Sequence, residues 1–258
     1  MNYNFFLVEI KSDVIVVTIN RPEVLNALHP PASHELSGII DSFEENDDLK
    51  VMIITGSGDK AFCSGNDLKY KSSVTEPIPL PLNGFGGLTA RFNIKKPIIS
   101  AVNGFALAGG MELILASDLC IATEKSIFGL PEPSVGLIAT SGGVTKLPKM
   151  IPHKIAMDII LCGRKLSAQE ALSFGLINKV VKDNEFLIET ALEMARSICK
   201  SSTLAVKASK EISNLAVFDK NFKDLYFSQK TVESAKKLYE SKESINTINS
   251  FLKNNKSS

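Results

Sequence analysis

Two glutamates and a pair of glycines are the residues of this chain best suited to chemistry. Gly109 and Gly110 follow an apolar run and open a segment with helical spacing, so a backbone N–H can approach a ligand at the positive end of a helix. Glu112 lies just inside that helix. Glu132 lies between two prolines with apolar neighbours, where poor solvation would raise the pKa of its carboxyl group. Two carboxylates beside exposed backbone donors predict acid–base chemistry at a polarised carbonyl.

Each of these residues also has a purely structural explanation. A glutamate in an early helical turn, such as Glu112, commonly interacts with the helix dipole and does nothing more. Glu132 could be a solvated loop acid, and the paired glycines could serve only close helix packing. The occurrence of both acids beside the glycine turn favours the functional interpretation.

A second loop of small residues, 61–68 (AFCSGNDL), follows a predicted strand and can also bring backbone close to a ligand. Cys63 within it could be a nucleophile. No histidine lies in a matching loop, however, and a small packed thiol is the favoured interpretation. Asp67 is either a turn or cap residue, or a member of the ligand loop through its backbone.

The composition argues against several other classes of protein. The 258 residues are 44% hydrophobic, enough for a large core, and 29 lysines and arginines nearly balance 28 acids. No long-range field therefore favours nucleic acid or an acidic membrane surface as a partner. The four cysteines are scattered singly, and the three histidines lack zinc-site spacing, so we expect a reducing, cytoplasmic setting and no metal. Without a leader or an apolar run of about eighteen residues, no export and no membrane span are expected.

Short apolar runs alternate with helical patterns in the first half of the chain. This alternation is typical of βαβ units and a mainly parallel sheet. The predicted strands are a hairpin of 5–10 and 14–20, followed by 51–55, 98–102 and 119–122. Pro30 and Pro31 can open a helix that runs to the acidic stretch at 44–48. Beyond Gly142 the strand signal nearly vanishes, and we expect the last third to be helical.

The helical last third has its own signals. Ser167 and Glu170 form a predicted capping box, and Gly175 is placed to stop the helix that they start. Further helices are expected over 185–200 and from Thr203, and the tail from Ser228 has one apolar and one basic face. We place a soft division at about residue 200, with a core at 1–200 and a helical C-terminal region at 201–258.

Residues 72–91 change to a composition rich in proline, glycine and threonine. Such a segment is either a mobile loop near the site or a plain surface insertion.

Five ordered segments resemble the enoyl-CoA hydratase/isomerase (crotonase) superfamily, and together they span nearly the whole chain. They are 20–28 (NRPEVLNAL), 61–68 (AFCSGNDL), 96–104 (KPIISAVNG), 128–132 (FGLPE) and 163–178 (GRKLSAQEALSFGLIN). The resemblance implies an α/β fold, a spiral of ββα units with a helical C-terminal region that assembles into trimers or hexamers. It also implies acyl-CoA thioester substrates and no separate cofactor, since coenzyme A is part of the substrate.

The resemblance also assigns roles to residues. The thioester oxygen would be held by the backbone N–H groups of Asn66 and Gly109, and losing one such donor costs ~3 kcal/mol in comparable sites. These two donors and the acids Glu112 and Glu132 form the implied catalytic set. The implied substrate contacts are Val24, Leu25, Ala61, Cys63, Asn66, Asp67, Leu68, Lys69 and Gly109.

The glutamate pair separates the activities that the resemblance allows. Family hydratases use two glutamates to activate water and deliver a proton, whereas isomerases typically keep a carboxylate at only one of the two positions. Hydration of a 2-enoyl-CoA is therefore predicted. Double-bond isomerisation is one alternative, and carnitinyl-CoA dehydration is another, since residues 86–89 and 141–149 are similar to that branch.

A third alternative is a non-catalytic acyl-CoA-binding protein. It is suggested by Ala108, which stands where many members have a third glycine, and by the unusual residues 138–141. The tail lysines either form a solvated face or contact the phosphates of coenzyme A.

Overall fold

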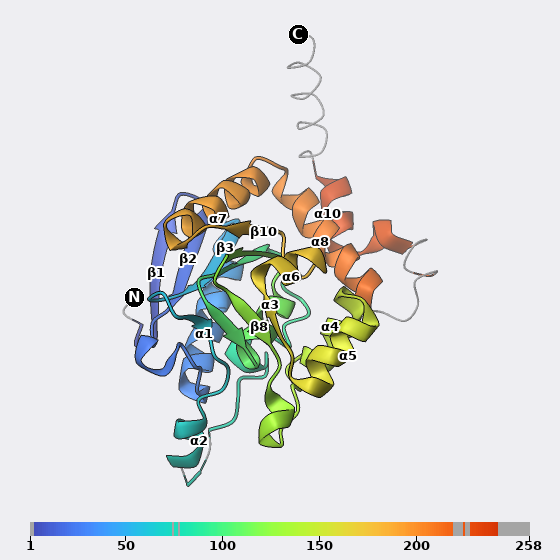
Figure 1. The fold of residues 1–258 in the computed structure, drawn as a ribbon. Helices are drawn as coiled ribbons and strands as arrows, with labels where there is room; N and C mark the ends of the chain where they lie inside the picture. The colour runs from blue at the N-terminus through green and yellow to red at the C-terminus, as the bar shows by residue number, and fades with distance from the viewer. Residues whose placement is uncertain (1–2, 74, 77, 219–223, 225–227, 242–258) are drawn as a thin grey trace.

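Two sheets of unequal size form the centre of the computed structural model, which describes residues 3–73, 75–76, 78–218, 224 and 228–241 (Figure 1). The larger sheet has six strands in the order β1-β2-β3-β5-β7-β10. Their bounds are β1 (Phe6–Lys11), β2 (Val14–Ile19), β3 (Val51–Gly56), β5 (Ile98–Val102), β7 (Leu119–Thr123) and β10 (Lys179–Val181). β1 and β2 form the predicted antiparallel hairpin, and all other neighbours in this sheet are parallel. The mainly parallel sheet is thus confirmed.

The smaller sheet was not predicted from the sequence, because its strands lie in or beside segments that were interpreted as small-residue turns. Its order is β4-β6-β8-β9, with β4 (Ala61–Cys63), β6 (Phe105–Leu107), β8 (Ile127–Gly129) and β9 (Lys165–Ser167). Strands of three residues are too short to show an alternating pattern. β9 and β10 also correct the expectation of a strand-free last third, because each is a short strand that completes a sheet begun earlier in the chain.

The helical segments are α1 (Pro30–Glu45), α2 (Leu68–Ser73), α3 (Gly109–Ala116), α4 (Gly143–Met150), α5 (His153–Cys162), α6 (Ala168–Ser173), α7 (Asn184–Cys199), α8 (Thr203–Phe218) and α10 (Glu233–Glu240), with short 3-10 turns η1 (Pro22–Val24), η2 (Phe85–Gly87), η3 (Glu132–Val135) and η4 (Gln229–Thr231). Five helices, α1, α3, α6, α7 and α8, begin at or next to the residues that the sequence signals indicate, whereas the starts of α2, α4 and α5 were not predicted. Both bonds of the capping box between Ser167 and Glu170 are present. The helices predicted over 185–200 and from Thr203 are α7 and α8. Most of the amphipathic tail, 242–258, lies outside the described residues.

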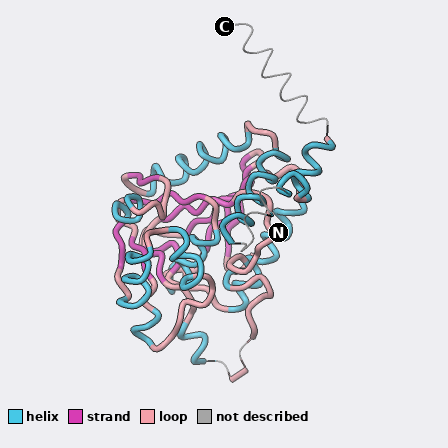
Figure 2. Tube along the Cα trace, turned by 90° about the vertical axis from the view of Figure 1, so that its right-hand side faces the viewer, coloured by secondary structure: helices cyan, strands magenta, loops and turns pink. Residues whose placement is uncertain are grey.

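Alternate residues along the strands of the large sheet are buried against helices on opposite faces of the sheet. Val14 and Val16 pack with Leu187, Leu192 and their neighbours on α7, which lies along one face of the sheet (Figure 1). The intervening Ile15 and Val17 belong to the larger cluster on the other face, which includes side chains of α1 and α3. This two-residue period is the pattern expected of strands covered on both faces. The side view shows helices surrounding the strands (Figure 2).

Lys96, at the start of β5, joins three distant parts of the chain. Its ammonium group is 2.7 Å from the carbonyl oxygens of both Phe43 and Asn46, so it caps the C-terminal end of α1. Its own carbonyl accepts a hydrogen bond from Nζ of Lys210 on α8, at 2.8 Å. Lys210 also pairs with Asp118, whose carboxylate holds the N–H of Ile98 in β5. α8 is therefore tied directly to the large sheet, and the division at residue 200 stays a prediction.

Candidate active site

Two tight turns bring the predicted backbone donors together. A Cβ atom added to Gly65 would lie 3.0 Å from the nitrogen of Gly109, and one added to Gly110 would lie 1.9 Å from the carbonyl oxygen of Cys63. No side chain fits at either glycine. The turn at residue 65 therefore lies directly against the start of α3, as a shared donor site requires.

The N–H groups of Asn66 and Gly109 are both left out of the backbone pairing around them. Asn66 lies in a parallel bridge in which Leu28 exchanges hydrogen bonds with the flanking Gly65 and Asp67, at 2.9 and 3.1 Å, so the N–H of Asn66 takes no part in it. Gly109 is the first residue of α3, where backbone N–H groups have no acceptor within the helix. Both donors thus lie on adjacent turns, with the helix dipole behind one of them.

Ala108 adopts a backbone conformation that glycine normally occupies. Its φ is 52° and its ψ is −124°, a region that disfavours a Cβ atom. Hydrogen bonds on both sides hold it there, since its N–H donates to Gly129 and its carbonyl accepts from Glu112. The alanine that departs from the family pattern keeps the geometry of the turn despite its methyl group.

Glu112 is buried and held by a second helix. Its side chain is 4% exposed, and Oε1 accepts the N–H of Gly143, the first residue of α4, at 3.0 Å. Burial raises the pKa of Glu112 to about 7, and the negative charge of Glu132 adds to this rise, whereas the Gly143 N–H and the charge of Lys146 oppose it. The carboxyl group therefore titrates near neutral pH.

Glu132 opens η3 and supplies a buried oxygen that lacks a partner. The residue is 8% exposed, and among the described residues Oε2 has no hydrogen-bond partner. Burial raises the pKa of this carboxyl as well. A buried polar atom left unpaired costs about 1–3 kcal/mol, so this oxygen marks a place where a ligand atom or a water molecule would be stabilised.

Residues 24 and 25 lie beside the 61–68 loop, as the predicted substrate contacts require. The carbonyl of Leu25 accepts the N–H of Ser64 at 3.1 Å, and the carbonyl of Val24 accepts its hydroxyl at 3.4 Å. Leu68 and Lys69 begin α2 with exposed side chains. These four positions are open to a ligand, and their contact with substrate stays a prediction.

Ala61 and Cys63 are fully packed within β4. The carbonyl of Ala61 accepts the side-chain amide of Asn26 at 2.7 Å. Cys63 is 0% exposed, and burial raises the pKa of its thiol to about 12. A thiol that stays protonated at neutral pH is a poor nucleophile, in agreement with the packed interpretation.

Asp67 acts as a cap, one of the two interpretations given from the sequence, and its contact with substrate stays a prediction. Its N–H donates to Leu28, and Oδ1 accepts the N–H of Tyr70 in the first turn of α2 at 3.0 Å. Oδ2 pairs with Arg21 at 3.0 Å. Burial alone would raise the pKa of Asp67, but these two partners outweigh it and lower the pKa. Its polar groups are thus used within the fold.

The segment at 72–91 lies beside the site, but its second half is not a mobile loop. The Phe85 ring fills the space next to Gly109, where an added Cβ would lie 2.5 Å from the ring. Gly87 packs equally closely on Ser37 of α1, and residues 85–89 are buried. This part of the segment is a buried turn that supports the start of α3.

Two residues of the site escaped the sequence analysis. Gly143 binds Glu112, and Lys146, one helical turn later, runs along Gly142 and donates to the carbonyl of Thr89 at 3.1 Å. The sequence did contain a signal for Gly143, because Gly142 and Gly143 precede a helical pattern as Gly109 and Gly110 do. A glycine pair at a helix start indicates close approach by another group.

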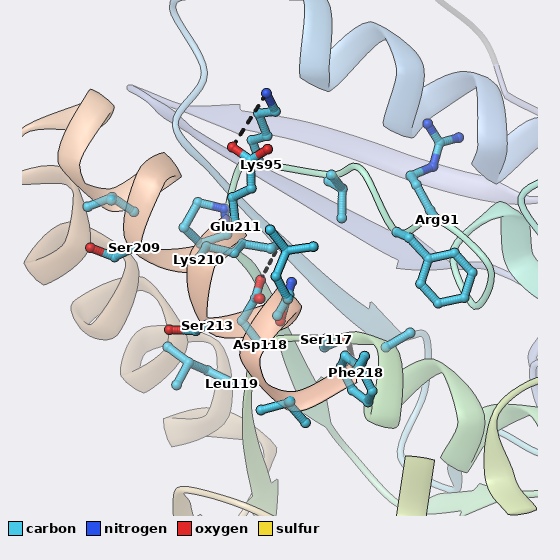
Figure 3. Close-up of a pocket in the computed structure, with 18 of the residues that line it drawn as sticks. Arg91, Lys95, Ser117, Asp118, Leu119, Ser209, Lys210, Glu211, Ser213 and Phe218 are labelled. Atoms are coloured by element: carbon cyan, nitrogen blue, oxygen red, sulfur yellow. Dashed lines mark hydrogen bonds and ion pairs between the residues drawn. The ribbon is translucent and has the colours of Figure 1, made fainter. Parts of the chain in front are cut away.

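A cavity of about 1480 Å³ is lined by neither Glu112 nor Glu132. Figure 3 shows Ser209, Lys210 and Ser213 of α8 close to Asp118 and Leu119, with Lys210 reaching Asp118. Its charges are mostly paired within the protein: Lys210 contacts Asp118 at 2.7 Å, and Lys95 contacts Glu211 at 3.6 Å. The cavity therefore offers space but no acid–base pair.

The described residues contain no group of three or more histidine, cysteine or acidic side chains arranged to hold a metal ion. Within the same residues, no helix combines the length and apolar character that a membrane crossing requires.

Comparisons with known proteins agree with this geometry. Residues 9–256 match the family described as Enoyl-CoA hydratase/isomerase. The carnitinyl-CoA dehydratase of Proteus mirabilis (strain HI4320) is 41% identical over 203 residues, 78% of this chain and 77% of that protein.

Solved structures show the same fold. The enoyl-CoA hydratase of Mycobacterium tuberculosis H37Rv matches with a TM-score of 0.89 and 33% identity, covering 97% of this chain and 96% of the other. A carnitinyl-CoA dehydratase of Mycobacterium avium 104 matches with a TM-score of 0.79 and 38% identity, over 91% and 95%. These likenesses confirm the fold predicted from the sequence.

Proposed function

Because this chain belongs to the enoyl-CoA hydratase/isomerase family, we propose that it adds water to, or removes water from, the 2,3 position of an acyl-CoA thioester. The observation that carries the proposal is the buried pair Glu112 and Glu132, in which Oε2 of Glu132 has no hydrogen-bond partner among the described residues. The isomerisation alternative needs only one carboxylate and leaves the second buried acid without a role.

The relatives favour the carnitinyl-CoA alternative over the generic enoyl-CoA hydratase that the sequence put first. The carnitinyl-CoA dehydratase of Proteus mirabilis is 41% identical to this chain, and the enoyl-CoA hydratase of Mycobacterium tuberculosis is 33% identical. We therefore propose, as the first substrate to test, an acyl-CoA whose acyl group carries a trimethylammonium group.

In the hydration direction, Glu112 as a carboxylate takes a proton from water while the water oxygen bonds to C3. The electron pair of the double bond moves toward the thioester oxygen, which the N–H groups of Asn66 and Gly109 stabilise. Glu132 as a carboxylic acid then gives its proton to C2, and dehydration reverses these steps.

The raised pKa of both acids suits this division of work. Burial raises the pKa of Glu112 to about 7 and also raises the pKa of Glu132, so each acid reaches its neutral form more easily than in water. After each turnover a proton passes from Glu112 back to Glu132. The path of this proton is short because the two carboxyl groups lie close enough to interact electrostatically.

The test is a comparison of substrates with purified protein. Loss of the conjugated-thioester absorbance is followed with the trimethylammonium-bearing 2-enoyl-CoA and with crotonyl-CoA. We expect kcat/KM to be at least ~10-fold higher for the first. A preference for crotonyl-CoA would return the assignment to a generic hydratase, and acyl-CoA binding without turnover of either would leave only a binding protein.

Assembly into trimers or hexamers and a cytoplasmic location stay predictions. Sedimentation of the purified protein tests the first, and fractionation of the source cells tests the second.

A further inference from the structure

Lys146 lies next to the proposed proton path without being part of it. It stands on α4, one turn after the Gly143 N–H that holds Glu112. Its side chain runs along Gly142, where an added Cβ would lie 3.3 Å from Cδ of Lys146. The stem of the lysine thus follows the same helix end that binds the carboxylate.

The Lys146 side chain is half-buried, and among the described residues it forms no ion pair with a carboxylate. It donates to the carbonyl of Thr89 at 3.1 Å and lies 5.7 Å from the centre of the Phe92 ring. Burial lowers the pKa of Lys146, and the negative charge of Glu112 opposes that effect. A half-buried cation whose direct contacts are neutral still attracts a nearby anion.

We propose that Lys146 is a positioning residue whose positive charge keeps Glu112 in the ionised form that activates water. The proposal rests on the function proposed above. The tie to Thr89 fixes the ammonium group in place, because residues 85–89 are buried against α1 and α3. Lys146 thereby links the helix that holds Glu112 to the turn that supports Gly109.

The other groups around Glu112 do not supply this charge. Glu132 on η3 is an acid and acts in the opposite direction. Cys63 on β4 stays protonated, and neither β6 nor η2 contains a titratable side chain. Arg91, beyond η2, is paired with Asp41 at 2.6 Å. Within the described part of the chain, the cation whose charge lowers the pKa of Glu112 is Lys146.

The test replaces the charge and follows the pH dependence of kcat/KM. Lys146→Met removes the cation, so Glu112 should ionise at higher pH, and the ascending limb should move up by about one pH unit, with a ~5-fold loss at pH 7 that recovers at pH 9. Lys146→Gln should shift the limb equally, although its amide can still donate to Thr89. Lys146→Arg should retain the wild-type limb.

Lys149→Met is the matched control. This lysine lies on the same helix, three residues further along, and donates to the carbonyl of Val217. Lys149→Met should leave the ascending limb of the pH profile of kcat/KM unchanged. A uniform loss of rate at every pH in Lys146→Met, or a wild-type profile in Lys146→Gln, would show that Lys146 serves only packing or the Thr89 bond.

A second measurement needs no turnover. The free energy of unfolding is followed from pH 5 to 9 for wild type, Lys146→Met, Glu112→Gln and the double variant. Lys146→Met should shift the wild-type pH dependence to higher pH and should leave it unchanged in the Glu112→Gln background. If this coupling is present while no enoyl-CoA reacts, the proposed function fails and the link between Lys146 and Glu112 stands; if the coupling is absent, the inference fails whatever the activity.

Discussion

The turns at Gly65 and Gly109 and the carboxylate pair Glu112 and Glu132 are proposed to act through different kinds of atoms. At Gly65 and Gly109 the proposed donors belong to the backbone, and the glycines are needed because neighbouring atoms leave no room for a Cβ. At Glu112 and Glu132 the proposed acid and base are side chains, and their pKa values depend on burial and on partners far away in the sequence. Close packing therefore determines which residue types fit in the first region, whereas burial and charge determine the pKa values in the second.

The largest effect is expected at the acid that delivers the proton. Glu132→Gln keeps the size of the side chain but removes the titrating proton, so turnover should fall ~10²-fold or more. Acyl-CoA affinity, measured by calorimetry, should be largely retained. Near-normal hydration in this variant would remove Glu132 from the proton path.

A slightly smaller loss is expected at the donor turn. Gly109→Pro removes the N–H itself and should lower kcat ~10²-fold. Gly109→Ala is the control for the added bulk, since it retains the N–H but places a Cβ 2.5 Å from the Phe85 ring. If the two variants lose the same rate, crowding rather than the missing donor explains the loss.

The third prediction concerns stability and pH at Glu112. Its folded pKa of about 7 lies above the ordinary value of 4.5, so the folded protein binds this proton more tightly than the unfolded chain does. The stability from this proton is fully present below pH 4.5 and is lost as the pH rises through about 7. Glu112→Gln should remove this decline, which corresponds to roughly 2.5 kcal/mol between about pH 5 and pH 8.

Denaturant titrations at pH 5 and pH 8 measure the difference. An unchanged pH dependence in the variant would mean that Glu112 titrates normally in the folded protein. Activity provides a second readout: Glu112→Ala should abolish hydration but should spare an isomerase that uses only Glu132.

The smallest effect is expected at Asn66. Because its backbone donates and its side chain is exposed, Asn66→Ala should change kcat/KM less than ~3-fold. A loss approaching that of Gly109→Pro would assign the donor role to the side-chain amide instead.

The sequence predicted the backbone region better than the side-chain region. Local signals placed three helix starts: the prolines at α1, the glycine pair at α3 and the capping box at α6. The partners of Glu112 could not be placed in this way, because Gly143 and Lys146 approach it only after α3 and α4 have packed together. The three-residue strands of the small sheet were missed for the same reason, since long-range pairing and not local propensity forms them.

Asp67 and the segment at 85–89 show the same limit. Both were judged from composition, which indicates a turn but not what the turn contacts. Burial of Phe85 beside Gly109, and of Asp67 beside Arg21, depends on tertiary packing that single-sequence patterns do not contain.

The bonds at Lys96 have a consequence for the order of folding. Lys210 reaches the carbonyl of Lys96 across a separation of 114 residues, and it is also the partner of Asp118. During synthesis, the large sheet can therefore assemble through β7 while this carbonyl and this carboxylate still face water, and α8 docks only once its residues have emerged. In the mature protein, α8 can open and close without disrupting the strands beneath it, so hydrogen exchange should be faster in α8 than in β5.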